Sequence, residues 1–324
     1  MKTIPELQDL IKKEISKLQF GDNPKNLYDP ISYIMSLGGK RMRPLLVLLA
    51  YQFKKNDVES VITPALAVEV FHNFTLMHDD IMDKAPLRRG QATVHEKWDE
   101  NVAILSGDTM LVKAYELMLQ IDPTLLPEAL RLFNKTAVEV CEGQQIDMNF
   151  ESRREVSVEE YIDMIRLKTA VLLGFSLELG ALMAGFSESD RARIYDLGVN
   201  MGIGFQLMDD LLDVYGDQEK FGKQVGGDIV TNKKTYLLIS ALNKAASEQM
   251  DVLNEWLSKE QFDAREKVAA VKSIYDQIGI KEMTTSKMNE YFDRSFEILD
   301  NLDADPNGKE ALRQFALALM KRES

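Results

Sequence analysis

The sequence predicts an all-α fold built as one domain. Apolar residues recur every three or four positions along almost the whole chain, and no stretch shows the sustained alternation of a half-buried strand. Glycine (18 of 324 residues) and proline (9) are few, and apolar residues make up 45% of the chain, so long uninterrupted helices are expected. No linker or low-complexity segment divides the chain, and its length suffices for one large core, so we expect a single domain over 1–324.

Turn residues mark the helix boundaries in the first third of the chain. Apolar spacing predicts an amphipathic helix over 4–19, and the segment FGDNPKN that follows is typical of a loop. The next short helix should end at Gly38 and Gly39. Pro44 and Pro64 each suit the first turn of a further helix, because proline needs no amide donor there. The helix that starts near Pro64 runs into an acidic cluster, HDDIMD.

The rest of the chain continues as helices. The apolar spacing predicts them over about 92–120, 126–150, 157–185 and 188–216, with smaller ones within 230–322. The segment DQEKFGKQVGGD at 217–228 is polar and rich in glycine, which is typical of a mobile loop. We expect this loop to close as a lid over the substrate-binding site described below.

Charge and composition exclude several classes of protein. The formal net charge of -13 argues against a nucleic-acid partner, and an anionic substrate would need local compensation by metal ions or by clustered Lys and Arg. Cys141 is the only cysteine, which excludes an intramolecular disulfide and fits a reducing compartment. The N-terminal segment lacks the apolar block of a signal peptide, and no run approaches the ~18 apolar residues of a membrane span. We therefore expect a cytoplasmic protein without stable membrane insertion.

Two short acidic clusters lie in otherwise apolar, helix-like surroundings. HDDIMD contains one and MDDLLD the other, and together they comprise Asp79, Asp80, Asp83, Asp209, Asp210 and Asp213. In each cluster the first and last aspartates are four residues apart, so they lie about 40° apart on one helix face. Carboxylates gathered in this way repel one another and attract a cation, and hard oxygen ligands suit Mg²⁺.

The presence of two such clusters predicts the kind of substrate. Mg²⁺ is usually held by one or two carboxylates together with substrate phosphates, so two clusters predict a diphosphate clamped between them. For either cluster alone, a solvated helix face or a helix cap is an equally good interpretation, because acidic runs on surface helices are common. The matching spacing and the apolar neighbours favour a metal site for the pair.

Basic residues stand near the first cluster. GGKRMRP places Lys40 and Arg43 beside a Gly-Gly turn, where side chains and backbone amides can converge on a phosphate, although an ordinary polar helix start has the same pattern. Arg88 and Arg89 follow the cluster in a turn and can point to different sides, although an arginine pair alone is more often surface charge. His72 lies two helical turns before the cluster, on nearly the same face, where it can bond a phosphate or be an ordinary core histidine.

A second group of polar residues accompanies the second cluster. They come from EGQQID, from the apolar helix RLKTAVLL, from the turn before MDDLLD, and from the glycine-rich loop and NKKT. The group comprises Gln144, Asp147, Lys168, Thr169, Gln206, Lys223 and Lys233. A lysine inside an apolar helix can simply reach the surface with its end group, but beside a bound diphosphate it would stabilise the leaving group. The lysines of the loop and of NKKT are candidates for a lid that closes on phosphates.

These motifs, taken in order, resemble the all-trans isoprenyl diphosphate synthases, also called polyprenyl synthetases. Five of them follow the family's order from about Gly38 to Lys234: GGKRMRP, HDDIMDKAPLRRG, GQQID, KT and GFQLMDDLLD. The resemblance implies a single bundle of about a dozen helices around a deep central cavity, usually in a homodimer. It also implies a prenyltransferase of the farnesyl or geranylgeranyl diphosphate synthase type. Such an enzyme joins isopentenyl diphosphate to an allylic diphosphate with the help of about three Mg²⁺ ions.

The resemblance implies a role for each matching residue. Mg²⁺ on the allylic diphosphate would be bound by Asp79, Asp83 and Asp209, with support from Asp80 and Asp213, and the predicted metal set is completed by Asp147 and Asp210. Isopentenyl diphosphate would be held by Lys40, Arg43, His72 and Arg89. The allylic diphosphate would be held by Arg88, Gln144, Lys168, Lys223 and Lys233, together with Thr169 and Gln206. The developing allylic cation would be stabilised by Lys168, Thr169 and Gln206.

The chemistry fits these groups. Metal ions and cationic side chains draw electron density into the diphosphate, the C1–O bond ionises, and the alkene of isopentenyl diphosphate attacks the allylic cation. Loss of a proton to the released diphosphate completes a head-to-tail C5 addition without a protein nucleophile. Water must be excluded, because it would trap the cation as an alcohol.

Residues before the first cluster bear on product length. Phe74 is five residues before Asp79, hence about 7.5 Å deeper along the helix at about 1.5 Å per residue, and Phe71 lies about one turn further. These rings can form a floor that stops the growing chain, or they can be ordinary core aromatics. In the family, an aromatic residue at this offset accompanies short products, whereas Thr75 departs from the paired aromatics of some farnesyl-forming members. We expect a C20 product, with C15 open and a medium-chain quinone-tail synthase as the alternative.

Two rival functions fit the motifs less well. A class I terpene cyclase also ionises diphosphates with a DDxxD motif in an all-α fold, but it normally lacks the second cluster and needs no GGKRMRP site. A non-catalytic partner subunit would be expected to have lost an acidic cluster or the basic set, and this chain retains both.

Overall fold

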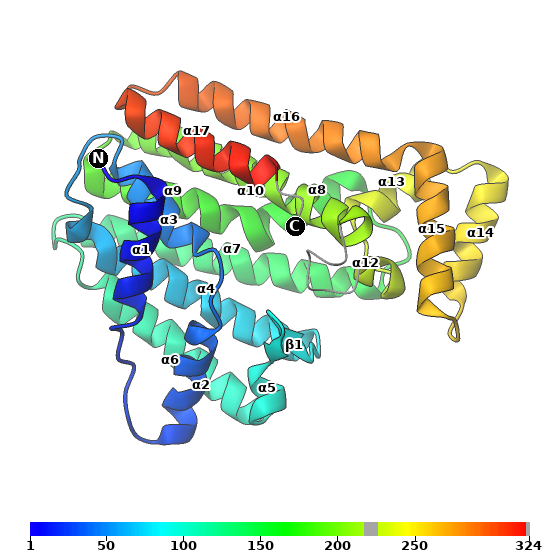
Figure 1. Cartoon of the computed structure of the whole chain (residues 1–324), viewed down its shortest axis with the longest axis horizontal. Coiled ribbons are helices and arrows are strands. Elements are labelled where there is room, and N and C mark those ends of the chain that lie inside the picture. Colours follow the sequence, from blue (N-terminus) through cyan, green and yellow to red (C-terminus); the bar gives the residue numbers. More distant parts are fainter. Residues whose placement is uncertain (217–225, 322–324) are drawn as a thin grey trace. The chain divides into compact units, whose positions relative to one another are not determined.

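Helices account for nearly all of the regular structure (Figure 1). The computed structural model describes residues 1–216 and 226–321. Within these residues the strands are confined to one hairpin, in which β1 (Leu87–Arg88) pairs antiparallel with β2 (Gln91–Ala92). The predicted all-α fold class is confirmed.

The helices follow one another with short connections. The first are α1 (Ile4–Ile15), α2 (Lys25–Ser36), α3 (Met42–Tyr51), the 3₁₀ turn η1 (Val58–Val61), α4 (Ile62–Met82), α5 (Val94–Lys97) and α6 (Glu100–Met118). Next come α7 (Leu126–Ser152), α8 (Val158–Ile165), the π-helical turn η2 (Arg166–Ala170), α9 (Val171–Ala184) and α10 (Glu188–Tyr215). The last are α12 (Gly227–Val230), α13 (Tyr236–Lys244), α14 (Ser247–Ser258), α15 (Ala264–Ile278), α16 (Ile280–Asp300) and α17 (Pro306–Met320).

Most predicted boundaries agree with these within a few residues, and the main exception has a local cause. The helix predicted over 92–120 is two helices, α5 and α6, because the backbone leaves the helical region at Trp98, with φ -115° and ψ -98°. Asp99 then starts α6 as its N-cap, where its side chain accepts a hydrogen bond from the Val102 amide at 2.8 Å. The helix predicted over 157–185 is present but contains the π turn.

The chain divides into two compact units, each discontinuous in sequence. Unit 1 comprises Met1–Thr136, Leu172–Asp196 and Leu299–Phe315. Unit 2 comprises Ala137–Val171, Leu197–Ile298 and Ala316–Ser324. The single domain expected from the sequence stays a prediction.

The core of unit 1 is built on α3 and α4. The α3 residues from Leu45 to Ala50 are 0% exposed, and α4 contacts both α3 and α6 (Figure 1). Gly180 of α9 faces the Val47 carbonyl of α3 so closely that any Cβ would overlap it. This packing holds α4 along its length, and the C-terminal turn of α4 carries the first acidic cluster.

In unit 2, two helices approach the backbone of the π turn. A Cβ on Gly143 of α7 would overlap the backbone nitrogen of Lys168, and one on Gly202 of α10 would lie 2.6 Å from Ala170 Cα. Glycine is needed at both positions, because a side chain would push the helices apart. In the same unit, α15 contacts α12, α13 and α14 (Figure 1).

Two helical segments are long and apolar enough to cross a membrane by length and composition alone, Val58–Met82 and Val158–Ala184. Of their most apolar windows, 61% and 83% is buried inside the protein. Burial of this extent is typical of core helices rather than of lipid-facing spans.

Candidate active site

The first acidic cluster lies at the C-terminal end of α4 in unit 1. Asp80 is 2% exposed, and Arg88 binds its carboxylate through Nε and Nη2, each at 2.7 Å. Burial raises the pKa of Asp80, and the hydrogen bonds and charge of Arg88 oppose that rise. Asp79 is half-buried and Asp83, the C-cap of α4, is exposed. Asp79 and Asp83 are therefore the more accessible carboxylates of the cluster, which fits the supporting role predicted for Asp80.

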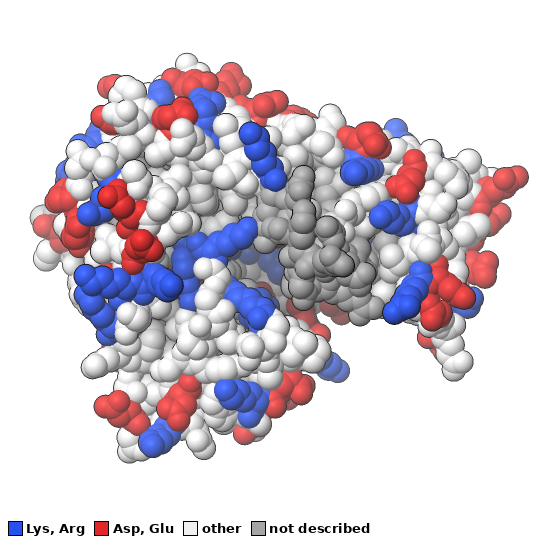
Figure 2. Space-filling model, in the orientation of Figure 1, with Lys and Arg blue, Asp and Glu red and all other residues white. Residues whose placement is uncertain are grey.

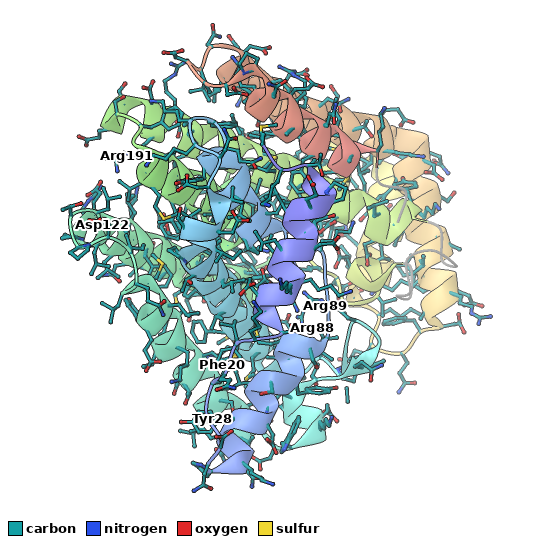
Figure 3. The ribbon with its side chains drawn as sticks, turned by 60° about the vertical axis from the view of Figure 1, so that its left-hand side comes forward. Phe20, Tyr28, Arg88, Arg89, Asp122 and Arg191 are labelled. Carbon is teal, nitrogen blue, oxygen red and sulfur yellow. The ribbon has the colours of Figure 1, made fainter. Side chains whose placement is uncertain are left out.

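The hairpin after α4 brings Arg89 against the predicted phosphate-binding turn. Arg89 has a φ of 53°, and its Nη1 donates a hydrogen bond to the Gly38 carbonyl. Gly39 has a φ of 115° and lies under the guanidinium, where a Cβ would sit 2.6 Å from Arg89 Cζ. A side chain at this position would displace Arg89. Figure 3 shows Arg88 and Arg89 next to each other, away from the part of unit 1 that holds Arg191.

Arginines gather around His72 in unit 1. Burial lowers the pKa of His72 well below its ordinary value, and the charges of Arg43, Arg89, Arg88 and Arg41 lower it further, so the imidazole is neutral at pH 7. Figure 2 shows Lys and Arg side chains gathered over the C-terminal half of α1 and the segment that leads into α3. Local positive charge of this kind is suited to an anionic ligand in a protein whose net charge is -13.

Arg43 and Lys40 differ in their surroundings. Burial lowers the pKa of Arg43 to about 10, and the Glu69 carboxylate opposes this, so the guanidinium stays charged at pH 7. Its Nε is buried without a hydrogen-bond partner within the protein. Lys40 is exposed. A buried donor of this kind is expected to bond water or a ligand.

Arg41 and Glu69 were not predicted as site residues, and they hold the basic set in place. Arg41 is the N-cap of α3 with a φ of 50°. Its Nη1 binds Glu69 Oε1 at 2.6 Å, and its Nη2 donates to the Met35 carbonyl. Glu69 is 2% exposed and also accepts from Asn73 Nδ2 at 3.0 Å. A carboxylate in an apolar helix three residues before His72 is the sequence signal that identifies it.

The polar residues predicted around the second cluster form a hydrogen-bonded chain in unit 2. Thr169 Oγ1 donates to Gln206 Oε1 at 3.1 Å, and Gln206 Nε2 donates to Asp210 Oδ1 at 3.2 Å. The Tyr161 hydroxyl donates to the other Asp210 oxygen. Tyr161 was not predicted, because an apolar helix position gives no signal that a tyrosine faces a carboxylate.

The π turn η2 carries Lys168 and Thr169. A π turn inserts one extra residue into a helix, and such turns are frequent at functional sites. Lys168 forms an ion pair with Asp147 of α7, and the two side chains are 20% and 16% exposed. Gln144, about one turn before Asp147, is 8% exposed. The structure thus pairs four of the predicted site residues: Lys168 contacts Asp147, and Thr169 contacts Gln206.

Asp210 is the most enclosed carboxylate of the second cluster. It is 4% exposed, and burial, followed by the nearby charge of Asp228, raises its pKa to about 8. Hydrogen bonds from Tyr161 and Gln206 and the charge of Lys233 oppose the rise. The local excess of negative charge is of the kind that a divalent cation relieves.

Asp213 joins the second cluster to the segment that follows the glycine-rich loop. Its Oδ2 accepts a hydrogen bond from the Asp228 amide at 3.0 Å, and its backbone carbonyl accepts from the Gly226 amide at 2.6 Å. Asp209, at the start of the cluster, is half-buried. Lys223 and most of the predicted lid lie outside the described residues, so those predictions stay untested.

The acidic residues fit Mg²⁺ bound jointly with a substrate. Within 1–216 and 226–321, no three Asp, Glu, His or Cys side chains are grouped closely enough to hold a metal ion by themselves. Mg²⁺ does not require such a cage, because it keeps several waters and takes its other ligands from phosphates. The predicted ligands therefore stay a prediction with which the structure is compatible.

Of the predicted chain-length residues, Phe71 and Phe74 belong to an aromatic cluster in unit 1, and Thr75 follows Phe74 in α4. The ring centroids of Phe71 and Phe74 are 5.6 Å apart, Phe71 and Phe133 are 5.0 Å apart, and Phe133 and Phe175 are 5.8 Å apart. Phe74 is 9% exposed, whereas the other three are at most 1% exposed. Thr75 donates its hydroxyl proton to the carbonyl three residues earlier at 2.8 Å. Phe74 is thus the outermost ring of this cluster.

Comparison with known proteins gives the same family throughout. The family described as Polyprenyl synthetase matches residues 24–278. A short chain isoprenyl diphosphate synthase of Methanocaldococcus jannaschii is 42% identical over 258 residues, which cover 79% of this chain and 79% of that protein. A solved geranylgeranyl pyrophosphate synthase has a TM-score of 0.95 and 44% identity, with 100% of both chains covered. A polyprenyl synthase from Caulobacter crescentus CB15, solved with calcium and isoprenyl diphosphate, has a TM-score of 0.88 and 26% identity over 99% of this chain and 97% of that one. The chain belongs to the polyprenyl synthetase family.

Proposed function

We propose that the protein is a short-chain prenyltransferase that condenses isopentenyl diphosphate with dimethylallyl, geranyl or farnesyl diphosphate to give geranylgeranyl diphosphate. The observation that carries this proposal is the basic set beside the first acidic cluster: Arg88 binds Asp80 of the cluster, and Arg89 donates to the Gly38 carbonyl of the turn that holds Lys40. An enzyme that ionises a single diphosphate needs the acidic cluster but has no use for a separate basic set. The names of the relatives at 42% and 44% identity support the same conclusion.

Isopentenyl diphosphate is held by the basic set of unit 1. Arg43 and Arg89 balance the charge of the diphosphate, and the buried Arg43 Nε gains a partner. His72 donates a hydrogen bond as a neutral imidazole and so adds no further repulsion among the guanidiniums. Lys40, on the exposed turn, contributes a charge at the edge of the set.

The allylic diphosphate would be bound through Mg²⁺, and Asp79, Asp83 and Asp209 are the residues that would hold the metal. When bound, Mg²⁺ supplies the positive charge that makes the diphosphate a good leaving group. The Thr169 proton is engaged by Gln206, so the lone pairs of the hydroxyl are available to the developing cation. Lys168 is held in place by Asp147 and balances charge on the departing diphosphate.

The product is C20 because the aromatic cluster limits the growing chain. Phe74 is its outermost ring, and Phe71, Phe133 and Phe175 behind it are fully buried. A longer tail would have to displace close-packed rings, which costs several kcal/mol by the measure of core substitutions. A medium-chain quinone-tail synthase remains the second candidate, and product mass distinguishes the two.

A homodimer in the cytoplasm is the working form that we propose. On and just after α6, Leu105, Val112 and Leu119 are 61%, 57% and 57% exposed and recur every seven residues, so they share one helix face. An exposed apolar stripe on a helix is typical of a protein interface. A second copy with the same stripe can cover it through a two-fold axis.

One incubation series tests the proposed function. The purified protein is supplied with labelled isopentenyl diphosphate, Mg²⁺ and the C5, C10 or C15 allylic diphosphate, and the products are measured by mass spectrometry. We expect geranylgeranyl diphosphate from every starter, released diphosphate in equal amount to the bonds formed, and no product when a chelator removes Mg²⁺. A cyclised hydrocarbon, or no product from any starter, would exclude the proposal. A C15 or a longer end product would change only the assigned length.

A further inference from the structure

Lys267, near the start of α15 in unit 2, belongs to none of the motifs and is 0% exposed. Its Nζ donates to the Val230 carbonyl at 3.1 Å and to Asn232 Oδ1 at 2.6 Å, and it lies 4.2 Å from the centroid of the Phe262 ring. A lysine is almost never fully buried unless its end group is well compensated. These three contacts are with neutral groups, so the ammonium is kept in place by hydrogen bonds and by the aromatic face rather than by an ion pair.

Both oxygen atoms belong to one short segment, residues 226–233, which we call the strap. The strap consists of α12 and the residues on either side of it. At its start it is tied to the second acidic cluster, because the amides of Gly226 and Asp228 both donate to Asp213. At its end it carries Lys233, whose amide donates to the Asp228 carbonyl at 2.9 Å. The start of the strap is therefore bonded to Asp213, which is predicted to support metal binding, and its end carries Lys233, which is predicted to bind the allylic diphosphate.

Asn232 is the residue through which the strap is fixed. Its φ of 57° is in the left-handed region, which asparagine tolerates better than most residues. Its Oδ1 accepts a hydrogen bond from Lys267 of α15, and its Nδ2 donates one to the Leu257 carbonyl of α14 at 3.0 Å. The side-chain amide of Asn232 is therefore bonded to both helices. At the other end of the strap, a Cβ on Gly226 would lie 2.6 Å from Val268 Cγ2 of α15. The strap thus has contacts with α15 at both of its ends.

The strap places two charges near the second cluster. The Asp228 amide donates to Asp213 Oδ2 at 3.0 Å, and the Lys233 amide donates to the Asp228 carbonyl at 2.9 Å, so the strap ties both charged residues to that cluster. The balance between them depends on where the strap sits, because electrostatic interactions in a buried site change steeply with distance. Residues behind the ligands of a metal or phosphate site commonly set this kind of geometry.

We infer that Lys267 is a positioning residue that fixes the strap, so that Lys233 and Asp228 are presented correctly to the Mg²⁺-bound diphosphate at the second acidic cluster. The inference rests on the proposed function and adds to it a residue that acts only through the strap. Lys267 lies behind Asn232 and Val230, and it has no part in the chemistry itself.

Lys267→Met tests the inference, because methionine keeps most of the length of the side chain and removes its charge and both hydrogen bonds. We expect KM for the allylic diphosphate, and the Mg²⁺ concentration for half-maximal rate, to rise roughly tenfold. KM for isopentenyl diphosphate should stay at the wild-type value. Lys267→Arg, which retains donors, should recover part of the loss.

A second variant separates positioning from a loss of stability. Asn232→Ala removes the same link from the side of the strap, and it should give the same pattern of KM values. The double variant should be no worse than either single one, because both changes break one link. Lys259→Met is the matched control: Lys259 is exposed and lies over Trp256 at 4.5 Å, and its removal should change none of these constants.

A binding measurement keeps this test separate from the test of the proposed function. Calorimetric titration of each variant with inorganic diphosphate and Mg²⁺ requires no turnover, and Lys267→Met should weaken that binding roughly tenfold. If the titration and the allylic KM stay at wild-type values while thermal stability falls, Lys267 is only structural and the inference is wrong. An equal rise in both KM values would also contradict it. If instead the wild-type protein binds diphosphate but forms no polyprenyl product, the proposed function fails and the titration still decides the role of Lys267.

Discussion

His72, which is half-buried, stays neutral at pH 7 because desolvation and the charges of nearby arginines lower its pKa, and this determines how it can bind a diphosphate. A charged imidazole would add to the repulsion between Arg43 and Arg89, whereas a neutral one donates one hydrogen bond at little electrostatic cost. Glu69 acts in the opposite sense. Its buried carboxylate binds Arg41 and raises the pKa of Arg43, against the effect of burial. Glu69, which lies outside every motif, thus helps the arginines of the basic set to stay charged although they are partly buried.

Phe74 gives a prediction about product length at the scale of a single side chain. In Phe74→Ala, the outermost ring of the aromatic cluster is removed, and the end product should lengthen by at least one C5 unit while the condensation itself continues. Mass spectrometry of the end product measures this directly. Phe186→Ala is the control, because this buried ring packs against Phe53, outside the aromatic cluster, and its loss should leave the length unchanged. An unaltered product from Phe74→Ala would exclude Phe74 as the floor.

Glu178 of α9 gives a prediction about pH. Burial raises the pKa of its carboxyl to about 7, and Arg191, Lys135 and Arg131 oppose the rise. In the unfolded chain the Glu178 carboxyl has a pKa near 4.5, so it loses its proton at a lower pH than in the folded protein. The folded state therefore binds more protons between these values, and the free energy of unfolding falls as the pH rises from about 4.5 to about 7.

Removal of this titration should stabilise the protein only above that range. Glu178→Gln should raise the free energy of unfolding at pH 8 by roughly 2 kcal/mol, less than the full shift would give because the side chain is partly exposed, and should give no gain at pH 4. Chemical denaturation at the two pH values measures the difference. Glu188→Gln, at an exposed position in the first turn of α10, should show no such pH dependence. A gain of equal size at both pH values would show that titration of Glu178 is not the cause.

At the scale of elements, the sequence predicts the positions of helices, which depend on local residue spacing, but not the features that depend on contacts with other helices. Apolar spacing and the flanking turn residues locate α4, α7 and α10 within a few residues, because both signals lie within or next to the segment itself. The π turn could not be predicted, since the approach of Gly143 and Gly202 from other helices is a tertiary contact. The same limit applies within the candidate site. The motifs identify Asp80, Arg88 and Asp210, but they predict neither the ion pair between Arg88 and Asp80 nor the contact of Tyr161 with Asp210, because a tertiary pairing has no periodic signal.

The exposed stripe on α6 gives a prediction at this scale. Val112→Glu places a charge in the middle of the stripe formed by Leu105, Val112 and Leu119, and a buried unpaired charge is too costly for an apolar interface to keep. We expect the variant to sediment as a monomer where the wild-type protein sediments as a dimer, with unchanged helical content. Val252→Glu is the control, because Val252 is 40% exposed on α14, outside the stripe. A dimeric Val112→Glu protein would place the interface elsewhere.

At the scale of the whole molecule, the predicted functional residues are distributed over both compact units. Unit 1 holds the first acidic cluster and the basic set, and unit 2 holds the second cluster with the hydrogen-bonded chain from Thr169 to Asp210. Neither unit carries a complete set of residues for the proposed reaction. If both units act on one substrate, the effect of a substitution in one unit on kcat should depend on whether the other unit is intact. A double-mutant cycle measures this dependence.

A double-mutant cycle across the two clusters measures this coupling. Asp79→Asn and Asp209→Asn should each lower kcat roughly a thousandfold, since each removes a carboxylate proposed to bind the same metal-bound diphosphate. Loss of either carboxylate already disrupts the binding of the metal-bound diphosphate, so loss of the second carboxylate adds little. The kcat of the double variant should be at most about tenfold lower than that of either single variant. Asp276→Asn, which removes a carboxylate that binds the Tyr215 hydroxyl at 2.9 Å, is the control, and its effect should simply multiply with that of Asp79→Asn. If the losses from Asp79→Asn and Asp209→Asn also multiply in full, the two clusters act in separate events and the two units do not share one diphosphate.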